Sequence, residues 1–478
     1  MKKLITMFLV FVFAVCALSA CTGKTINSGG TGGNGEGIYA GRTLLISMRL
    51  SGYDRWLDDY AAAFEMETGC EVSINWNPSL NSEVRNIFLS ESYIHDDLYF
   101  ATTSDIWYDW AKDGLLYPIT GLEDIVSDEV KSYGIYENQR YMLAPFMPPT
   151  GFVYNQEYLD EIPGRGEYVQ GEFPDTWQGL LDLCDQINSM SSIGGRSGIK
   201  PMSWSGTKDD LDRMFRGLWA QGNGGEDWYN YLSQDGAEPE RDAFVNDSIK
   251  NALRAMSQLI NSDGTYSQNS ILGCGEKDNI QQQQNFLNGD CVFCPSGGWF
   301  ETEMKDSITS DTFEYGFANY PQIDTSQTER TAFIDVPAEV FFIPADALEA
   351  ELAVEFLKFI FTEENCVELH KDLGTPMAFK YTFTEEDRAD LNEFSQQVTD
   401  VVMNNTVVMK GSNNIMYLTG GVMGGLYNAR GDALEMFTEK MLTNEPGYTV
   451  NDIDQIVEEN YQGYQTLWDS KLRAAGLL

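Results

Sequence analysis

The chain has 478 residues, and 73 acidic against 31 basic side chains give it a formal net charge of −42 at pH 7. Phosphate backbones and anionic membranes repel so acidic a surface, which argues strongly against binding to nucleic acid or to anionic lipid. The length and the apolar content, 42% of residues, suffice for two domains with well-formed cores.

The N-terminus is typical of an exported protein. Lys2 and Lys3 precede an apolar stretch at 4–15, which is too short to span a bilayer comfortably. Residues 1–20 are therefore expected to be a signal peptide. The Leu-Ser-Ala-Cys run at 18–21 resembles a bacterial lipobox, which implies that Cys21 is lipidated and becomes the mature N-terminus. An ordinary cleaved signal followed by an incidental cysteine is the alternative.

Residues 22–37 contain seven glycines among polar residues, a composition typical of a flexible coil. We expect residues 21–40 to be a tether that holds the folded body away from an anchoring surface. No later segment is predicted to span a membrane, so the N-terminal lipid is the only membrane contact expected.

The folded body opens with a βαβ pattern. Alternating strands and helices predict a largely parallel sheet. The expected strands lie at 43–48, 72–76 and 97–100, and the expected helices at 53–66, 83–89 and 106–113.

An apolar, proline-rich passage at 141–154 suits an extended crossing between two lobes. A second crossing is expected near 333–340. Between and beyond these crossings we expect helices at 177–187, 208–219, 247–260, 280–287, 348–361 and 453–472, and a strand at 290–294.

Several short motifs occur along the chain in a specific order. They include Pro-Asp-Thr-Trp at 174–177, Phe-Leu-Asn-Gly-Asp at 286–290 leading to Ser-Gly-Gly-Trp at 296–299, and Tyr315 to Pro321. With the segments at 64–72, 97–100, 139–145 and 153–159, this order resembles the bacterial extracellular solute-binding protein family 1, over roughly residues 43–470. That family includes the sugar- and oligosaccharide-binding lipoproteins of ABC importers.

The resemblance implies an α/β, two-lobed, periplasmic-binding-protein-like fold. Each lobe would be a mostly parallel sheet flanked by helices, with the ligand cleft between the lobes. The N-terminal lobe would comprise residues 41–147 and about 335–380, and the C-terminal lobe about 148–334 and 381–478. The implied partners are a small polar ligand, a carbohydrate, and the permease subunits of an ABC importer. The protein would be a lipid-anchored, extracytoplasmic monomer.

A sugar site needs flat aromatic platforms for the apolar ring faces and hydrogen-bonding groups around the rim. The resemblance makes Trp299 the leading platform and adds Trp204 and Tyr417 as further aromatic candidates. For Trp204 and Tyr417, plain packing is the alternative. The Met-Pro-Pro-Thr run at 147–150 departs from maltodextrin binders, which tend to place an acidic residue after the crossing proline, so a maltose-like specificity is not implied.

The polar candidates follow predicted strands. Asp105 and Ser104 come after the strand at 97–100, at the carboxyl edge where ligands of such folds gather. Capping of the next helix explains them equally well. Arg49, directly after the first strand, would bond a ligand or pair with a local acid. Tyr154 and Trp219 are weaker candidates, and packing in a core is the stronger interpretation for both.

No cofactor or metal is expected. Cys291 and Cys294 form a CxxC within a strand-like run, but the chain has only two histidines and no second CxxC. A disulfide among Cys274, Cys291 and Cys294, or simple buried thiols, both remain open.

Two other functions compete with import. A glycoside hydrolase would need a pair of carboxylates, and no spacing in this chain selects one. Serine-triad and zinc hydrolases lack their motifs. A ligand sensor that feeds a receptor kinase would keep the fold, and the sequence alone does not separate it from an importer component. Ligand identity and envelope type also remain open.

Overall fold

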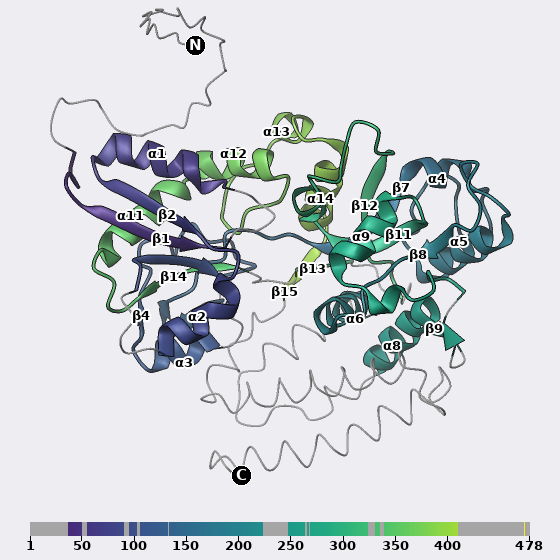
Figure 1. The fold of residues 1–478 in the computed structure, drawn as a ribbon, viewed down its shortest axis with the longest axis horizontal. Coiled ribbons are helices and arrows are strands. Elements are labelled where there is room, and N and C mark those ends of the chain that lie inside the picture. Colours follow the sequence, from purple (N-terminus) through teal and green to yellow (C-terminus); the bar gives the residue numbers. More distant parts are fainter. Residues whose placement is uncertain are drawn as a thin grey trace, which may run out of the picture.

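The computed structural model describes residues 37–49, 55–89, 95–102, 106–131, 133–222, 247–262, 265–266, 268–323, 330–334, 339–409 and 473. Two α/β bodies lie side by side (Figure 1), each built around its own sheet. We call them the first body and the second body, after the first and second sheets. The arrangement confirms the expected α/β class.

The first sheet has the strand order β2-β1-β3-β14-β4. Its strands are β1 (Thr43–Met48), β2 (Glu71–Trp76), β3 (Leu98–Ala101), β4 (Leu116–Tyr117) and β14 (Val340–Pro344). The helices of this body are α1 (Leu57–Thr68), α2 (Leu80–Leu89), α3 (Ile106–Lys112), α11 (Ala350–Ile360) and α12 (Glu363–Leu373).

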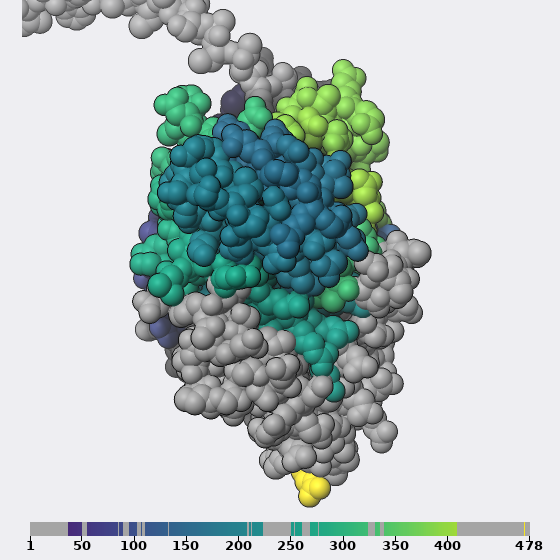
Figure 2. Space-filling model, turned by 90° about the vertical axis from the view of Figure 1, so that its right-hand side faces the viewer, coloured from purple at the N-terminus to yellow at the C-terminus, as the bar shows by residue number. Residues whose placement is uncertain are grey.

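The second sheet has the order β12-β7-β11-β8. Its strands are β7 (Thr150–Asn155), β8 (Lys200–Met202), β11 (Cys291–Gly297) and β12 (Tyr315–Asn319). Around it lie α4 (Gln156–Glu161), α5 (Trp177–Ser189), α6 (Lys208–Gly222), α8 (Asp247–Ile260), α9 (Asn279–Leu287), α10 (Phe300–Glu303) and α14 (Glu393–Met403). Figure 2 views the molecule from the side of the second sheet, and in this view the segment that carries α4 and α5 faces the viewer.

Small elements complete the described chain. They are the β5 (Ile135–Tyr136) and β6 (Gln139–Arg140) hairpin, the β9 (Asn261–Ser262) and β10 (Thr265–Tyr266) pair, the parallel pair of β13 (Thr331–Ile334) and β15 (Thr406–Met409), the 3-10 turn η2 (Cys274–Glu276), and α13 (Glu385–Ala389).

Local sequence signals set several boundaries. Helix α1 ends at Gly69, whose φ of 75° is left-handed, a conformation that glycine adopts without strain, and β2 begins two residues later. Helix α5 starts where the Thr176 hydroxyl accepts the Gly179 N–H at 3.1 Å. Both boundaries agree with the motifs recognised in the sequence.

The strand directions correct one expectation. Strands β1, β2 and β3 are parallel, but β14 runs antiparallel to both β3 and β4. In the second sheet β7 runs antiparallel to β11 and to β12, and only β8 and β11 pair in parallel. Each sheet therefore departs from the expected parallel arrangement at one strand, β14 in the first sheet and β7 in the second. The reason is that β7 and β14 enter their sheets directly from the other body, without the helical crossover that parallel neighbours require.

Each body has its own core. One buried cluster surrounds the first sheet and includes the tightly packed aromatics Phe100, Phe341 and Phe342. The second sheet is buried on both faces, since alternate residues of β7 enter different clusters, with Phe152 in one and Val153 in the other. This explains why every residue of β7 is buried.

Extended segments join the bodies near the middle of Figure 1. The segment before β7 forms isolated bridges between Phe146 and Met377 and between Pro149 and Ile334. The Thr150 hydroxyl also donates to the Phe333 carbonyl at 3.1 Å. Passages from three parts of the chain thus lie beside one another where the bodies meet.

The described cysteines, Cys70, Cys184, Cys274, Cys291, Cys294 and Cys366, are all free and buried. The structure therefore favours core thiols over a disulfide among Cys274, Cys291 and Cys294. Within the described ranges, no helix is both long enough and apolar enough to cross a membrane.

Candidate functional site

Three strands of the second sheet end at the same edge. Strands β8 and β11 are parallel, and β12 shares their direction because β11 and β12 both run antiparallel to β7. Strand β7 begins at this edge, where Thr150 pairs with Gly297. Since β7 arrives from the first body, the carboxyl ends of β8, β11 and β12 lie on the side where the bodies join. Ligands of α/β folds bind at such carboxyl ends.

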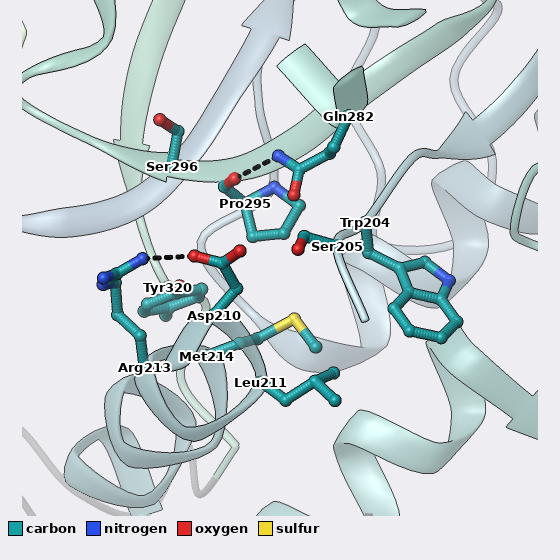
Figure 3. A pocket seen from close by; sticks show the side chains of 10 residues that line it. All are labelled: Trp204, Ser205, Asp210, Leu211, Arg213, Met214, Gln282, Pro295, Ser296 and Tyr320. Atoms are coloured by element: carbon teal, nitrogen blue, oxygen red, sulfur yellow. Dashed lines mark hydrogen bonds and ion pairs between the residues drawn. The ribbon is translucent and has the colours of Figure 1, made fainter. Parts of the chain in front are cut away.

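A hollow with an empty volume of about 280 Å³, partly open to solvent, lies at this edge. Much of that volume is open solvent; the enclosed part, about 20 Å³, holds a single water molecule, so a larger ligand requires the surrounding side chains to move apart. Residues from several elements line it (Figure 3): Trp204 and Ser205 after β8, Asp210, Leu211, Arg213 and Met214 on α6, Gln282 on α9, Pro295 and Ser296 on β11, and Tyr320 after β12. It thus combines apolar surface with a carboxylate, hydroxyls and an amide.

Asp210 and Arg213 form an ion pair at the rim, with 2.6 Å between Arg213 Nη1 and Asp210 Oδ1. The Thr207 hydroxyl donates to the other carboxylate oxygen, also at 2.6 Å. The side chain of Asp210 is only 15% exposed, and that of Arg213 is 23% exposed. Partial burial limits solvent screening, so this pair holds its geometry better than an exposed ion pair does.

Glu303 extends the charged cluster. Its carboxylate accepts hydrogen bonds from Gln283 Nε2 at 2.7 Å and Asn279 Nδ2 at 3.1 Å. Burial raises the pKa of Glu303 above its usual value, although these hydrogen bonds and the positive charge of Arg213 oppose the shift. The Gln283 side-chain oxygen in turn accepts from the Ser296 hydroxyl at 3.2 Å, so the cluster connects to the hollow.

Trp299 lies two residues beyond β11 and at the N-terminus of α10. It is partly buried and packs against the buried cluster of the first sheet, which also takes in Met147 of the crossing segment and Val402 of α14. The Arg213 guanidinium carbon lies over its indole, 5.1 Å from the ring centroid. Trp299 is therefore a residue of the second body that packs against the buried cluster surrounding the first sheet.

Arg49 follows β1 at the carboxyl end of the first sheet. Its Nη1 lies 2.6 Å from Glu339 Oε1, and the Glu339 side chain is only 8% exposed. Glu339 precedes β14, where the chain enters the first body. Of the two roles considered for Arg49, the structure shows the pairing with a local acid.

Trp204, Tyr154 and Trp219 are packed in the second core. The Trp204 indole N–H donates to Ser270 Oγ at 3.0 Å, and its ring lies on the far side of Ser205 from Asp210 (Figure 3). Tyr154 stacks on Phe173 and bonds Gln397. Packing thus accounts for all three, although Trp204 also borders the hollow. The other candidates, Ser104, Asp105, Tyr417 and Cys21, lie outside the described residues.

Sequence reasoning missed Asp210, Arg213 and Glu303. One signal was present, because Thr207 followed by Asp210 has the spacing of a helix-capping pair, directly after the predicted second-lobe aromatic. No local pattern places Glu303 near α6, since tertiary packing brings the two together. Among the residues that the structure describes, no cluster of three or more His, Cys, Asp or Glu side chains is arranged to hold a metal ion.

Comparison with known proteins identifies a family. The sequence model of the family described as bacterial extracellular solute-binding protein matches residues 59–392, well over half of the chain. The match begins within α1 and ends just before α14, so it covers the whole second sheet and every strand of the first sheet except β1. No curated protein matches the chain.

Proposed function

The chain belongs to the bacterial extracellular solute-binding proteins, and on this premise we propose that it captures a sugar or short oligosaccharide and delivers it to the permease of an ABC importer. Proteins of this family bind a small ligand for transport on the outer side of the cytoplasmic membrane, and they are generally not enzymes. The resemblance to solute-binding proteins seen in the sequence is thereby confirmed at the level of the family.

The chemistry of the side chains that line the hollow at the edge of the second sheet, and not the size of the hollow, is the observation that carries the sugar assignment. Asp210, Ser205 and Gln282 offer hydrogen-bonding groups, while Leu211 and Met214 offer apolar surface. A sugar presents hydroxyl edges and apolar ring faces, so it matches both kinds of lining. Asp210 has acceptor capacity beyond its bonds to Thr207 and Arg213, because a carboxylate offers about four lone-pair positions.

Lobe closure provides the mechanism. We take residues 41–147 with about 335–380 as one lobe, and about 148–334 with 381–478 as the other. A ligand that contacts both lobes binds the closed form better than the open form, so it shifts the population toward closure. The permease then recognises the closed form. No covalent step is required.

Membrane attachment through Cys21 completes the proposal. The lipobox-like run at 18–21 and the glycine-rich segment after it support a lipidated N-terminus with a tether. Metabolic labelling with a palmitate analogue in a bacterial host is expected to label the protein but not Cys21→Ala. Equal labelling of both proteins would contradict the anchor and leave the ligand assignment unaffected.

Thermal-shift titration of the purified full-length protein with mono- and oligosaccharides tests the ligand assignment. A ligand that binds only the folded state raises the Tm with its concentration. We expect a saturable shift for one saccharide, and about 10-fold or greater loss of affinity in Asp210→Asn, because a charge-assisted hydrogen bond contributes ~1.5–3 kcal/mol.

Asp185→Asn is the matched control, since Asp185 also pairs with an arginine, Arg165, but is about half exposed on α5. It should bind like the parent protein. No shift with any saccharide would overturn the sugar assignment, and equal losses in the two variants would remove Asp210 from the site.

A further inference from the structure

A charged side chain lies over the ring of Trp299, which is unexpected for a tryptophan on which a sugar would stack. The Arg213 guanidinium lies over its ring at 5.1 Å from the centroid, inside the ~6 Å range of a cation–π contact. A sugar that stacks on tryptophan needs the same position over the ring.

The backbone at Gly297 covers one face of the indole. A Cβ placed on Gly297 would come within 2.3 Å of Cζ3, 2.4 Å of Cη2 and 2.6 Å of Cε3 of Trp299. Nearly equal distances to three consecutive ring atoms put that position above the ring and not beyond its edge. A ligand is therefore left with the opposite face.

Acidic partners hold the guanidinium where it is. Asp210 accepts its Nη1–H at 2.6 Å, and the Thr207 hydroxyl fixes Asp210 from the other side. Glu303 is close enough to interact electrostatically with Arg213. Removing Arg213 from the ring thus costs the cation–π contact, but the ion pair with Asp210 can persist at the rim.

We propose that Arg213 is a specificity-determining residue, which occupies the open face of Trp299 until a ligand displaces it. This inference rests on the proposed function, because it takes a saccharide as the ligand and Trp299, the platform expected from the sequence, as the ring on which the saccharide stacks. Displacement sets a threshold: a ligand binds only if its stacking and hydrogen bonds outweigh the contact that it replaces. Saccharides with broad apolar faces pass this threshold, and small polar solutes without such a face do not.

The first arm of the test needs no ligand. Hydroxyl-radical footprinting with peptide-level mass spectrometry measures the oxidation rate of Trp299 in the full-length protein. In Arg213→Met, which keeps the stem and removes the guanidinium, the rate is expected to rise about 2- to 5-fold, the equilibrium ratio that an ordinary cation–π contact supports. Arg165→Met, which removes an arginine paired with Asp185 away from the hollow, should leave the rate unchanged. An unchanged rate in Arg213→Met overturns the proposal.

The second arm uses any saccharide that shifts the Tm of the parent protein. Arg213→Met is expected to bind it about 2- to 5-fold more tightly, since the competing contact is gone. Trp299→Ala is expected to lose most of the affinity. Equal or weaker binding by both Arg213→Met and Arg213→Gln overturns the proposal, and the second variant controls for an apolar side chain at the rim. If no saccharide binds but the oxidation rate of Trp299 still rises in Arg213→Met, the sugar assignment fails, while the position of Arg213 over the Trp299 ring is supported.

Discussion

His370 Nε2 lies 2.8 Å from Thr399 Oγ1, and this contact joins α12 of the first body to α14, which packs on the second sheet. The Thr399 hydroxyl donates to the Ser395 carbonyl, so its oxygen accepts the Nε2 proton. On the other side, Nδ1 accepts from the Tyr381 hydroxyl at 2.8 Å, and the Tyr381 oxygen accepts the Met377 N–H. All partners are satisfied when the imidazole is neutral with its proton on Nε2.

The first prediction concerns acid stability. Burial lowers the pKa of His370 to about 3 from the usual 6.5, against the opposing charge of Asp387. Between these values the unfolded chain binds a proton that the folded protein does not, so the free energy of unfolding falls as the pH falls from about 6.5 toward 3. The free energy of unfolding of His370→Gln at pH 7.5 should be about 1–3 kcal/mol lower than that of the parent protein, because the hydrogen bonds to Thr399 and Tyr381 are disrupted.

Urea unfolding at pH 7.5, 6 and 5 measures this. The stability of His370→Gln should decline less steeply over that range than the stability of the parent protein, since glutamine does not titrate. Two curves of equal slope would show that His370 does not contribute to acid sensitivity.

The second prediction concerns Asp97, which holds two parts of the first body together. Its carboxylate accepts the Leu45 N–H of β1 at 2.9 Å and the Glu349 N–H before α11 at 2.8 Å. Asp97→Ala leaves both part-buried donors without a partner and should cost about 1–3 kcal/mol in denaturant unfolding. Leu45 N–H and Glu349 N–H bond different oxygens of Asp97, and asparagine keeps only one acceptor oxygen and turns an NH₂ group toward the other donor. Asp97→Asn should therefore be destabilised as well, and parent-like stability of Asp97→Asn would contradict this account.

The third prediction separates binding from stability. Gly297→Ala would place a methyl group within 2.3 Å of the Trp299 ring, so the indole must move from its place between Gly297 and Arg213. Isothermal titration with the saccharide identified above should show a 10-fold or greater loss of affinity, about 1.4 kcal/mol.

Gly195→Ala is the control, because Gly195 has a φ of 73° but open space where a methyl group would stand. It should lower the Tm through backbone strain and leave the affinity unchanged. Tight binding by Gly297→Ala would mean that the position of the Trp299 ring does not matter for the ligand.

The fourth prediction concerns the buried thiols. Burial raises the pKa of Cys274 to about 11 and that of Cys294 to about 12, which keeps both protonated and unreactive. A thiol reagent should label none of the six described cysteines in the native protein and all six in denaturant without a reductant. Only four labels in denaturant would indicate one disulfide and contradict the structure.

Much of the local structure could be predicted from the sequence. The strand at 43–48 and the helix starts at 106, 177, 208 and 247 were placed correctly. Gly69 and Thr176 show why, because a left-handed cap and a side-chain cap depend on residues within a few positions of each other. The order of the motifs also identified the family, since each marks an element boundary that the chain must keep in sequence.

The site was less predictable. Trp299 was named from its motif, and the structure places it beside the hollow, but Trp204 and Tyr154 proved to be packed in a core. A tryptophan after a strand has the same local pattern whether its ring faces a cleft or a core. The sequence did not predict Asp210, Arg213 and Glu303, because their proposed role depends on tertiary contacts with one another and with Trp299.

By itself the sequence determined the two α/β bodies, the buried strands, the helix caps and membership of the solute-binding family, because these follow from hydrophobic periodicity and contacts within a few residues. Only the tertiary structure decided that β14 returns antiparallel to β3, that Arg213 covers a ring 86 positions later in the chain, and that His370 meets Thr399. The physical reason is that such contacts join distant segments. Their geometry is set by how whole elements pack, and no short stretch of sequence encodes it.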